Sequence, residues 1–298
     1  MQTRAARLRT LLESPTLSFL MEAHNGLSAR LVEEAGFEAI WASGLSMSAS
    51  QGLRDCNEAS WTQTLECIEF MADAAGIPIL VDGDSGHGNF NNVRRFVQKL
   101  ERRGAAGVSL EDKQFPKINS FIDGPRQPLA DPGEFAGRIR AAVDVRADDD
   151  FMIVARTEAL IAGRGLGEAL HRAEQYWRAG ADAILIHSAR EDAAEVLEFR
   201  RAWRATLPVV IVPTTYHRTP TDIFRAHGFS AVIWANQLLR ASLAAMQQVA
   251  ARIARDQCLH HVEADIAPLS EVFRLQRMDE LHDAERRYQE QPPLRRPA

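Results

Sequence analysis

The feature that most constrains the fold is a sequence pattern that recurs four times: a helix end, a glycine, two or three small or mixed residues, and then an apolar run. The copies lie at residues 35–43, 103–111, 179–187 and 227–234. A glycine directly after a helix supplies a left-handed cap, and an uninterrupted apolar run suits a strand covered on both faces of a parallel sheet. The pattern therefore predicts helices and parallel strands in alternation.

Eight apolar runs fit strands of such a sheet. They are Ser18–Ala23, Ala39–Ala42, Ile79–Asp82, Gly107–Leu110, Phe151–Arg156, Ala183–His187, Val209–Val212 and Ala231–Trp234. Helical patterns lie between them, at Leu27–Ala35, Phe90–Arg103, Gly133–Ala142 and Gly167–Ala179. Eight alternations indicate the α/β class and a (β/α)8 TIM-type barrel, in which catalytic groups stand on the loops after the strands. A doubly wound open sheet is the alternative, but no Gly-x-Gly-x-x-Gly sequence follows the first strand.

Two further helices are expected after the eighth strand, at Leu238–Asp256 and Ser270–Tyr288. A minimal barrel does not need them, and their apolar positions, such as Val272, Phe273 and Leu281, require a partner surface. We expect a single barrel domain over residues 1–298 whose extension, residues 238–290, packs on a neighbouring subunit. The alternative is that the extension folds back on its own barrel.

Charge and cysteine content exclude several classes of protein. The net charge of −5 and the pI near 6.0 argue against general nucleic-acid binding, which requires a basic face or tail. The three cysteines, Cys56, Cys67 and Cys258, show no metal-binding spacing, which favours a reducing compartment. No segment reads as a signal peptide or reaches membrane-spanning length. We expect a cytoplasmic protein that acts on a small molecule.

Acidic residues follow two of the predicted strands. In a barrel the strand exits face one mouth, so Asp82, Asp84 and Glu111 would converge there, and Asp55 in a nearby loop could join them. Hard carboxylate oxygens of this kind suit Mg²⁺. The alternative is that Asp82 and Asp84 only form a turn and cap a helix.

Cationic and polar groups follow other strands. A guanidinium at the end of an apolar run, as in Arg156, is costly to bury unless an anion meets it, although a structural pair with Glu158 would also serve. His187 could donate a hydrogen bond to a phosphoryl oxygen or simply hold a core carbonyl. Ser43 and Asn236 follow the second and eighth strands. The loop after Glu111 carries two lysines, an amide and a hydroxyl, which suits a mobile cover over an anionic ligand.

The same loop resembles a known family signature. Glu111-Asp112-Lys113, five residues and then Asn119-Ser120 is similar to the signature of phosphoenolpyruvate mutase, in the isocitrate lyase and phosphoenolpyruvate mutase superfamily. Segments along nearly the whole chain are similar as well: residues 21–25, 41–46, 57–62, 88–92, 161–163 and 273–277. This breadth makes an accidental match to one motif improbable.

The resemblance implies a Mg²⁺-dependent isomerase that interconverts phosphoenolpyruvate and phosphonopyruvate, the first step of phosphonate biosynthesis, in a homo-oligomer, a dimer or tetramer. It also implies roles for individual residues. Asp82 would bind the metal directly, and its water molecules would be held by Asp55, Asp84 and Glu111, of which Asp55 would also be catalytic. The pyruvyl site would be lined by Trp41, Ser43, Gly44 and Leu45. The phosphoryl group would be bound by Arg156, His187 and Asn119, with Ser120 in the substrate site and the catalytic Lys117 on a gating loop.

The chain departs from the family pattern at four positions. Gly83, Ser85, His87 and Thr157 stand where Ala or Ile, Thr, Tyr and Val are more usual in the family. None of these removes an assigned group. We expect Gly83 to loosen the metal loop and Thr157 to alter the wall beside Arg156.

Three other functions compete with this reading. A phosphonopyruvate hydrolase would share the fold and the metal site, but that family has threonine in place of the loop asparagine, so Asn119 favours the mutase. A carbon–carbon lyase of the superfamily would carry a loop cysteine, which Lys113–Lys117 lacks. A barrel that only binds a metabolite is disfavoured because every assigned ligand group is present.

Overall fold

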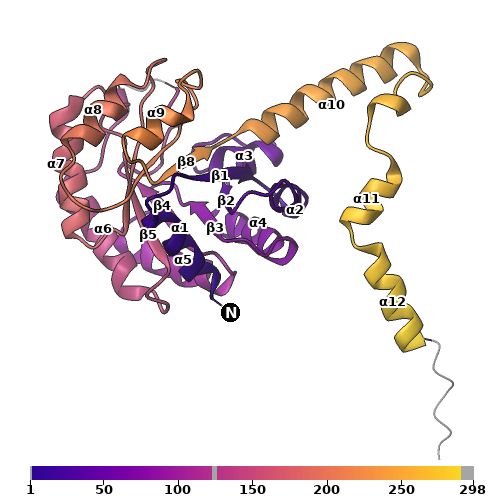
Figure 1. The fold of residues 1–298 in the computed structure, drawn as a ribbon, viewed down its shortest axis with the longest axis horizontal. Helices are drawn as coiled ribbons and strands as arrows, with labels where there is room; N and C mark the ends of the chain where they lie inside the picture. The colour runs from indigo at the N-terminus through magenta and orange to yellow at the C-terminus, as the bar shows by residue number, and fades with distance from the viewer. Residues whose placement is uncertain (1, 123–125, 290–298) are drawn as a thin grey trace, which may run out of the picture. The chain divides into compact units, whose positions relative to one another are not determined.

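Eight parallel strands close into a barrel in chain order, with β8 pairing back to β1 (Figure 1). The computed structural model describes residues 2–122 and 126–289. The strands are β1 (Ser18–Ala23), β2 (Ala39–Ala42), β3 (Ile79–Asp82), β4 (Gly107–Glu111), β5 (Met152–Thr157), β6 (Ala183–Ile186), β7 (Val209–Ile211) and β8 (Ala231–Trp234). The predicted barrel is confirmed, and each predicted strand boundary lies within one residue of the observed one.

One helix precedes the first strand, and the others follow the strands and form the outer layer. The helices are α1 (Arg4–Glu13), α2 (Gly26–Glu34), α3 (Gly44–Ser50), α4 (Trp61–Ala74), α5 (Phe90–Arg102), α6 (Pro132–Val145), α7 (Gly165–Arg178), α8 (Ala194–Ala202) and α9 (Thr221–Ala226). Side-chain caps fix where several of them begin. The side chains at these starts, those of Asn25, Ser60 and Asn89, each accept a hydrogen bond from a backbone amide of the first turn. A side chain of that turn accepts in return from the backbone amide of the capping residue, so N–H groups that would otherwise be unpaired are satisfied.

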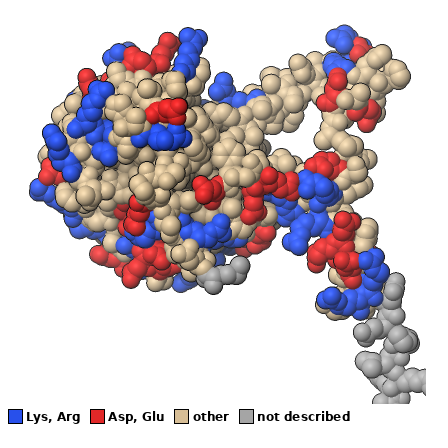
Figure 2. All heavy atoms as spheres, in the orientation of Figure 1, with Lys and Arg blue, Asp and Glu red and all other residues tan. Residues whose placement is uncertain are grey.

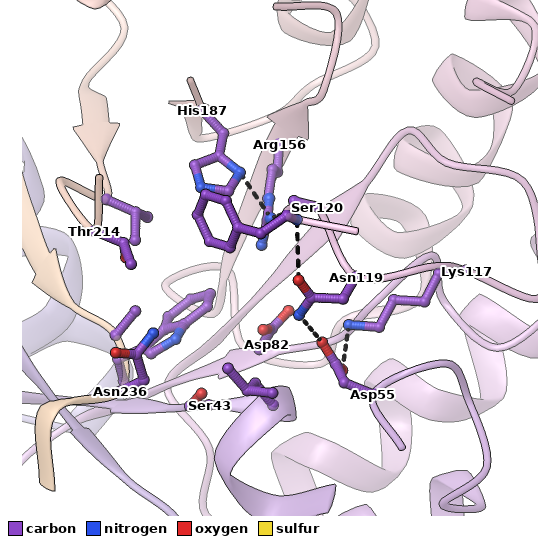
Figure 3. A pocket seen from close by; sticks show the side chains of 15 residues that line it. Ser43, Asp55, Asp82, Lys117, Asn119, Ser120, Arg156, His187, Thr214 and Asn236 are labelled. Carbon is purple, nitrogen blue, oxygen red and sulfur yellow. Dashed lines mark hydrogen bonds and ion pairs between the residues drawn. The ribbon is translucent and has the colours of Figure 1, made fainter. Parts of the chain in front are cut away.

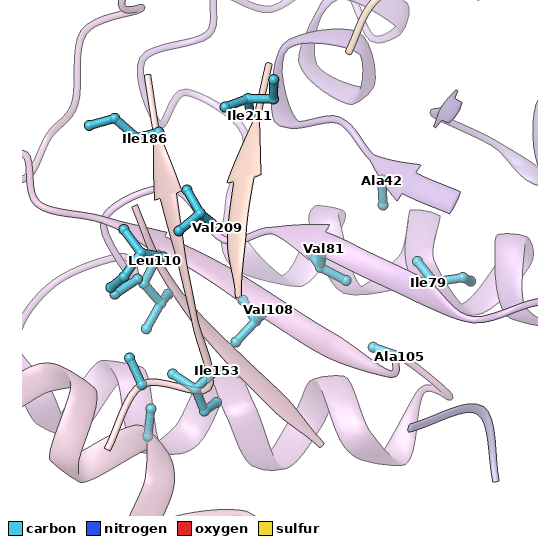
Figure 4. Close-up of a cluster of buried hydrophobic side chains, with 14 of the residues drawn as sticks. Ala42, Ile79, Val81, Ala105, Val108, Leu110, Ile153, Ile186, Val209 and Ile211 are labelled. Atoms are coloured by element: carbon cyan, nitrogen blue, oxygen red, sulfur yellow. The ribbon is translucent and has the colours of Figure 1, made fainter. Parts of the chain in front are cut away.

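Alternate side chains of each strand serve two different cores. Inward-facing residues such as Leu80, Val154 and Leu185 fill the barrel, and Leu8 and Leu12 of α1 join them. Outward-facing residues lie between the strands and the helices (Figure 4). This filled interior is the packed layer structure typical of TIM barrels, so polar groups at the strand ends stand on a rigid support.

Close packing also explains a glycine in the acidic loop after β3. A Cβ atom on Gly83 would lie 2.5 Å from Val108 Cγ2 and 3.0 Å from Leu110 Cδ2, and the Gly83 amide donates a hydrogen bond to Ser109 O at 2.8 Å. The backbone here approaches β4 too closely for a side chain. The expectation that Gly83 loosens this loop finds no support in this packing.

The chain divides into two compact units, one ending at Arg240 and one beginning at Ala241. The second contains most of α10 (Gln237–Asp256), the short helix η2 (Glu263–Asp265), α11 (Leu269–Leu275) and α12 (Met278–Gln289). The prediction of one helix over Ser270–Tyr288 was wrong. Arg277 has a left-handed φ of 58°, and the amides of Gln276 and Arg277 cap α11, so the helix ends and a second one starts.

On the visible side of the barrel unit, basic and acidic side chains are interspersed (Figure 2). Among the described residues, no helix combines the length and the apolar character needed to cross a membrane.

Candidate active site

A cavity of about 50 Å³ opens at the carboxyl ends of the strands (Figure 3). Seven strands or the loops that follow them contribute to its lining. The lining residues are Trp41, Ser43, Leu45, Asp55, Asp82, Lys117, Asn119, Ser120, Phe121, Arg156, His187, Val212, Thr214, Ala235 and Asn236. The parallel register brings these distant segments together, since all strand exits meet at one end of the barrel.

One side of the site, here called the acidic wall, consists of Asp55, Asp82, Asp84 and Glu111. The ammonium group of Lys117 lies between two of these carboxylates, 2.7 Å from Asp55 Oδ1 and 2.6 Å from Asp84 Oδ1. Burial by itself raises the pKa of Asp55, but Lys117 and a 2.6 Å hydrogen bond from Asn119 Nδ2 bring that pKa below its usual value. The acidic carboxylates raise the pKa of Lys117 despite its burial, so this lysine is charged.

The other three carboxylates of the acidic wall differ in their partners: Asp84 contacts Lys117 and accepts from Asn57 Nδ2 at 2.8 Å, whereas Glu111 Oε2 lies 3.5 Å from Arg156 and 3.7 Å from Lys113. Burial raises the pKa values of Asp82, Asp84 and Glu111. Both carboxylate oxygens of Glu111 are buried without a hydrogen-bond partner in the described part of the chain. A Cβ atom on Gly44 would lie 3.1 Å from Asp84 Oδ1 and 3.3 Å from Asp82 Oδ2, so the helix start of α3 approaches these oxygens closely.

This donor set fits a hard divalent cation. All donors are carboxylate oxygens, some lack partners, and a cationic side chain already lies against two of them, which are the conditions that favour Mg²⁺. Within residues 2–122 and 126–289, no three Asp, Glu, His or Cys side chains form a complete metal-binding cluster.

The opposite side, here called the basic wall, consists of Lys113, Arg156 and His187 around the buried carboxylate of Glu158. Arg156 Nε donates to Glu158 Oε1 at 2.5 Å, and His187 Nδ1 lies 3.0 Å from the same oxygen. Lys113 Nζ is 3.4 Å from Glu158 Oε2. Burial would raise the pKa of Glu158, but these cations hold it well below its usual value. The carboxylate of the basic wall is thus fully paired, and two cations against one carboxylate leave the wall with positive charge for an anion.

The ring of His187 presents one nitrogen to the cavity. Nδ1 contacts both Glu158 and Arg156 Nη2, the latter at 3.0 Å, while Nε2 is buried without a partner among the described residues. Burial lowers the pKa of His187 against the opposing effect of Glu158, which favours the neutral ring. A neutral ring has two tautomers here: Nδ1 either donates to the Glu158 carboxylate or accepts from Arg156. Only the second tautomer places a hydrogen on Nε2 that can be donated to a ligand.

The segment Lys113–Ser120, here called the flap, covers the space between the two walls. Lys113 Nζ donates to Ile118 O at 2.8 Å and to Ser120 Oγ at 2.7 Å, which fixes the curvature of the segment from within. Ser120 Oγ in turn contacts Glu158 Oε2 at 2.7 Å and Arg156 Nη2 at 2.9 Å. Lys113, Lys117 and Ser120 are buried, so the flap lies closed over the site.

The sequence candidates meet around this cavity, but three of them do not line it. Gly44, Asp84 and Glu111 lie behind the lining residues, against Asp82 and Arg156. For Arg156 both readings apply, since it pairs with Glu158 and also lines the cavity. The remaining candidates all contribute to the lining.

Sequence reasoning missed several residues at the site. Thr214 and Val212 after β7 line the cavity, and the rule that strand exits carry site residues could have found them. Phe121 packs edge-on against His187, with ring centroids 5.3 Å apart. The expectation that Thr157 alters the wall beside Arg156 gains no support, because Thr157 is fully buried and donates to Asp112 Oδ2 at 3.2 Å.

Comparison with known proteins gives a consistent picture. The family model described as phosphoenolpyruvate phosphomutase matches residues 8–254. A phosphoenolpyruvate phosphomutase of Tetrahymena pyriformis is 55% identical over 285 residues, which cover 96% of this chain and 95% of that protein.

Two crystal structures show the same fold. That of a phosphoenolpyruvate phosphomutase from Streptomyces platensis subsp. rosaceus superposes with a TM-score of 0.93 at 48% identity, covering 95% of this chain and 99% of the other. That of a phosphonopyruvate hydrolase in complex with oxalate and Mg²⁺ gives 0.91 at 40% identity, covering 97% and 100%. With its barrel and nearly its whole length in common with these proteins, the chain belongs to the phosphoenolpyruvate phosphomutase family.

Proposed function

We propose that this protein is an isomerase that interconverts phosphoenolpyruvate and phosphonopyruvate, moving the phosphoryl group between the enol oxygen and carbon three of one pyruvyl skeleton. The observation that carries the proposal is the division of one closed cavity into an acidic and a basic wall. The higher identity to a protein named as the mutase, 55% against 42% for the hydrolase, supports the same choice. None of Cys56, Cys67 and Cys258 lines the cavity, so the cysteine chemistry of the superfamily lyases has no support here.

The phosphoryl group would bind at the basic wall. Arg156 is permanently charged and lies at the cavity with its guanidinium held by Glu158 and Ser120, so little reorganisation is needed when an anion arrives. The unpartnered Nε2 of His187 would donate a hydrogen bond to a phosphoryl oxygen. Asn119 would add an amide donor from the flap. Such donors stabilise the charge on a metaphosphate-like fragment.

The pyruvyl end would bind beside Ser43, Gly44 and Leu45. These residues form the N-cap and the first turn of α3, where backbone amides have no helical acceptor. The amides of Ser43 and Gly44 donate to Ala23 O at 3.2 Å and Asp82 Oδ2 at 3.3 Å, so the Leu45 amide would be the donor to a substrate carboxylate. Trp41 supplies an apolar floor next to them. The substrate would then span the cavity, with its carboxylate toward the acidic wall and its phosphorus toward the basic wall.

Mg²⁺ is the cofactor that the acidic wall fits. Asp82 would hold it directly, and Asp55, Asp84 and Glu111 would hold its water molecules. Bound there, it would supply positive charge to the enolate oxygen that forms when the phosphorus bond breaks. The chain's own residues provide the rest: the Leu45 amide orients the substrate carboxylate, and the flap excludes water.

Exclusion of water decides the outcome of the reaction. While the phosphoryl group moves between the enol oxygen and carbon three, it reacts with any water that is present. The cavity must therefore stay closed during the transfer. The closed flap, with its internal bonds from Lys113, supports a mutase over a hydrolase.

We also propose that the C-terminal helices exchange between subunits of a homo-oligomer in the cytoplasm. The described residues of α10, α11 and α12 include no buried one, and Leu269, Val272, Phe273 and Leu281 are exposed. On the barrel unit, Leu27 and Phe70 expose apolar area of α2 and α4. A second copy of the chain would cover both surfaces. Light scattering on the Phe273→Asp variant should show a smaller particle than wild type, and an unchanged particle mass would contradict the exchange.

Phosphorus NMR tests the proposed reaction. Purified protein with phosphonopyruvate and Mg²⁺ should produce phosphoenolpyruvate as the main product, because the enol ester is the more stable isomer of the pair. Inorganic phosphate as the main product would instead identify a hydrolase and reject the proposal.

A further inference from the structure

Asn57 occupies an unusual place in the loop between α3 and α4. Its backbone has a left-handed φ of 60°, and its side chain lies between the flap and the acidic wall. Sequence analysis assigned it no role. Neither wall includes it, and it does not line the cavity.

The side chain of Asn57 makes one hydrogen bond in each direction. Its Oδ1 accepts from the backbone amide of Lys117 at 2.7 Å, and its Nδ2 donates to Asp84 Oδ2 at 2.8 Å. The partners determine this orientation, because a flipped amide would place N–H against N–H and oxygen against a carboxylate. Asn57 therefore ties the flap backbone to a carboxylate of the acidic wall.

Another residue of the same loop, Asp55, also contacts the flap. Asp55, two residues earlier, bonds Lys117 Nζ at 2.7 Å and Asn119 Nδ2 at 2.6 Å. Those contacts reach flap side chains, which must reorient when a substrate or a cation arrives. The Asn57 contact reaches the flap backbone, so it can hold the flap in place while the side chains move.

The loop does not need Asn57 for its own shape. Glu58 accepts from the backbone amide of Arg54 at 2.8 Å and from Arg54 Nε at 2.6 Å, and the Cys56 amide donates to Arg54 O at 2.9 Å. This local brace leaves the amide of Asn57 available for a role outside the loop.

We propose that Asn57 is a positioning residue that couples flap closure to the acidic wall, so that phosphoryl transfer takes place only in a closed cavity. The inference rests on the proposed mutase function. When the tie is removed, water enters and its oxygen attacks phosphorus as the carbon–phosphorus bond of phosphonopyruvate breaks. The electron pair passes to the enolate, carbon three takes a proton, and the products are pyruvate and inorganic phosphate.

The Asn57→Gly variant tests this directly, since glycine accepts a positive φ without strain and removes only the side chain. Gln257→Gly is the matched control, because it makes the same change at a φ of 48° in an exposed position. Hydrogen exchange of the Lys117 amide in the ligand-free protein should accelerate about tenfold in Asn57→Gly, as expected for loss of one hydrogen bond, and stay at the wild-type rate in the control.

Product analysis is the second readout. With phosphonopyruvate and Mg²⁺, Asn57→Gly should release a larger fraction of inorganic phosphate than wild type, an effect that a general loss of stability does not produce. Should Asn57→Gly fold poorly, Asn57→Asp keeps the acceptor for Lys117 but opposes Asp84, and it should raise the phosphate fraction while Lys117 stays protected.

The results separate the two proposals. If the wild-type protein forms no phosphoenolpyruvate, the mutase function is overturned, and the product analysis no longer bears on Asn57. Wild-type exchange at Lys117 together with a wild-type phosphate fraction in the folded Asn57 variants overturns the coupling role even when the mutase reaction is found.

Discussion

The two walls of the site differ in how their charges are balanced. In the basic wall the Glu158 carboxylate touches Arg156, His187 and Lys113, and its pKa is held well below the usual value. In the acidic wall one close ammonium group, that of Lys117, serves several carboxylates, and burial raises the pKa values of Asp82, Asp84 and Glu111.

This difference teaches which half of the site is complete. Buried charges are stable when each has a partner, and an excess of one sign carries a desolvation cost that a bound ion offsets. The basic wall is complete with its own side chains and is organised for an anion in advance. The acidic wall has more negative charge than the chain balances, as a cation site requires.

The largest expected effect comes from removing a carboxylate of the acidic wall. Asp82→Ala should lower turnover by about 10³-fold or more, because the metal's contribution to charge stabilisation amounts to several kcal/mol. The fold should persist, since the variant removes a desolvated charge and little core volume. Phosphorus NMR gives the turnover and thermal unfolding the stability. Asp73→Ala, on the exposed face of α4, is the control, and an Asp82→Ala enzyme as active as that control would refute the metal assignment.

The corresponding change in the basic wall should act on stability as well. Glu158→Gln leaves two buried cations, Lys113 and Arg156, without this carboxylate, so the free energy of unfolding should fall by about 3 kcal/mol and turnover should fall too. Denaturant unfolding measures the change. Glu134→Gln breaks an ion pair with Arg138 in which Glu134 is half exposed, and should cost below about 1 kcal/mol. Equal losses in the two variants would show that Glu158 is not the balancing charge.

Addition of Mg²⁺ tests the acidic wall by itself, because the basic wall is not expected to bind the cation. At a hundredfold excess over its dissociation constant, Mg²⁺ should raise the free energy of unfolding of the wild-type protein by about 2.7 kcal/mol. Glu158→Gln should respond in the same way, while Asp82→Ala should not. A shift that survives in Asp82→Ala would place the binding elsewhere.

The smallest effect concerns His87, which lies in the loop after β3 with its ring edge-on to Phe96. Burial lowers its pKa from 6.5 to about 4. Between those values the unfolded chain binds more protons, so this contribution to stability is complete above pH 6.5 and declines as the pH falls toward 4. From pH 8 to pH 5, wild type should lose up to about 2 kcal/mol more than His87→Asn, a residue that tolerates the positive φ. Parallel stability curves would exclude this histidine as the cause.

Much of the fold could be predicted because its signals are local. A glycine after a helix and an apolar run before a polar residue each act within a few residues, and they located all eight strands. The break between α11 and α12 could not be predicted in this way. The helical pattern continues through Gln276 and Arg277, and only the left-handed backbone of Arg277 ends α11.

The site was predictable as a set of groups, but of its pairs only the local one between Arg156 and Glu158 could be named from the sequence. Strand exits and the flap motif indicated which side chains would face the mouth. Other pairs join residues far apart in sequence: Lys117 N and Asn57 Oδ1 are 60 positions apart, and His187 and Glu158 are 29 apart. The role of Asn57 and the contact of Glu158 with His187 follow from these distant pairs, which no local pattern contains.

The amino-acid order alone determined that strands and helices alternate and that acids, a guanidinium and an imidazole stand where strands end, because backbone preference and hydrophobic periodicity act over short distances. The closed barrel decided which charge meets which. Only when the strand ends are brought together do burial and distance set the pKa values, leaving one wall with its carboxylate paired and the other with an excess of negative charge.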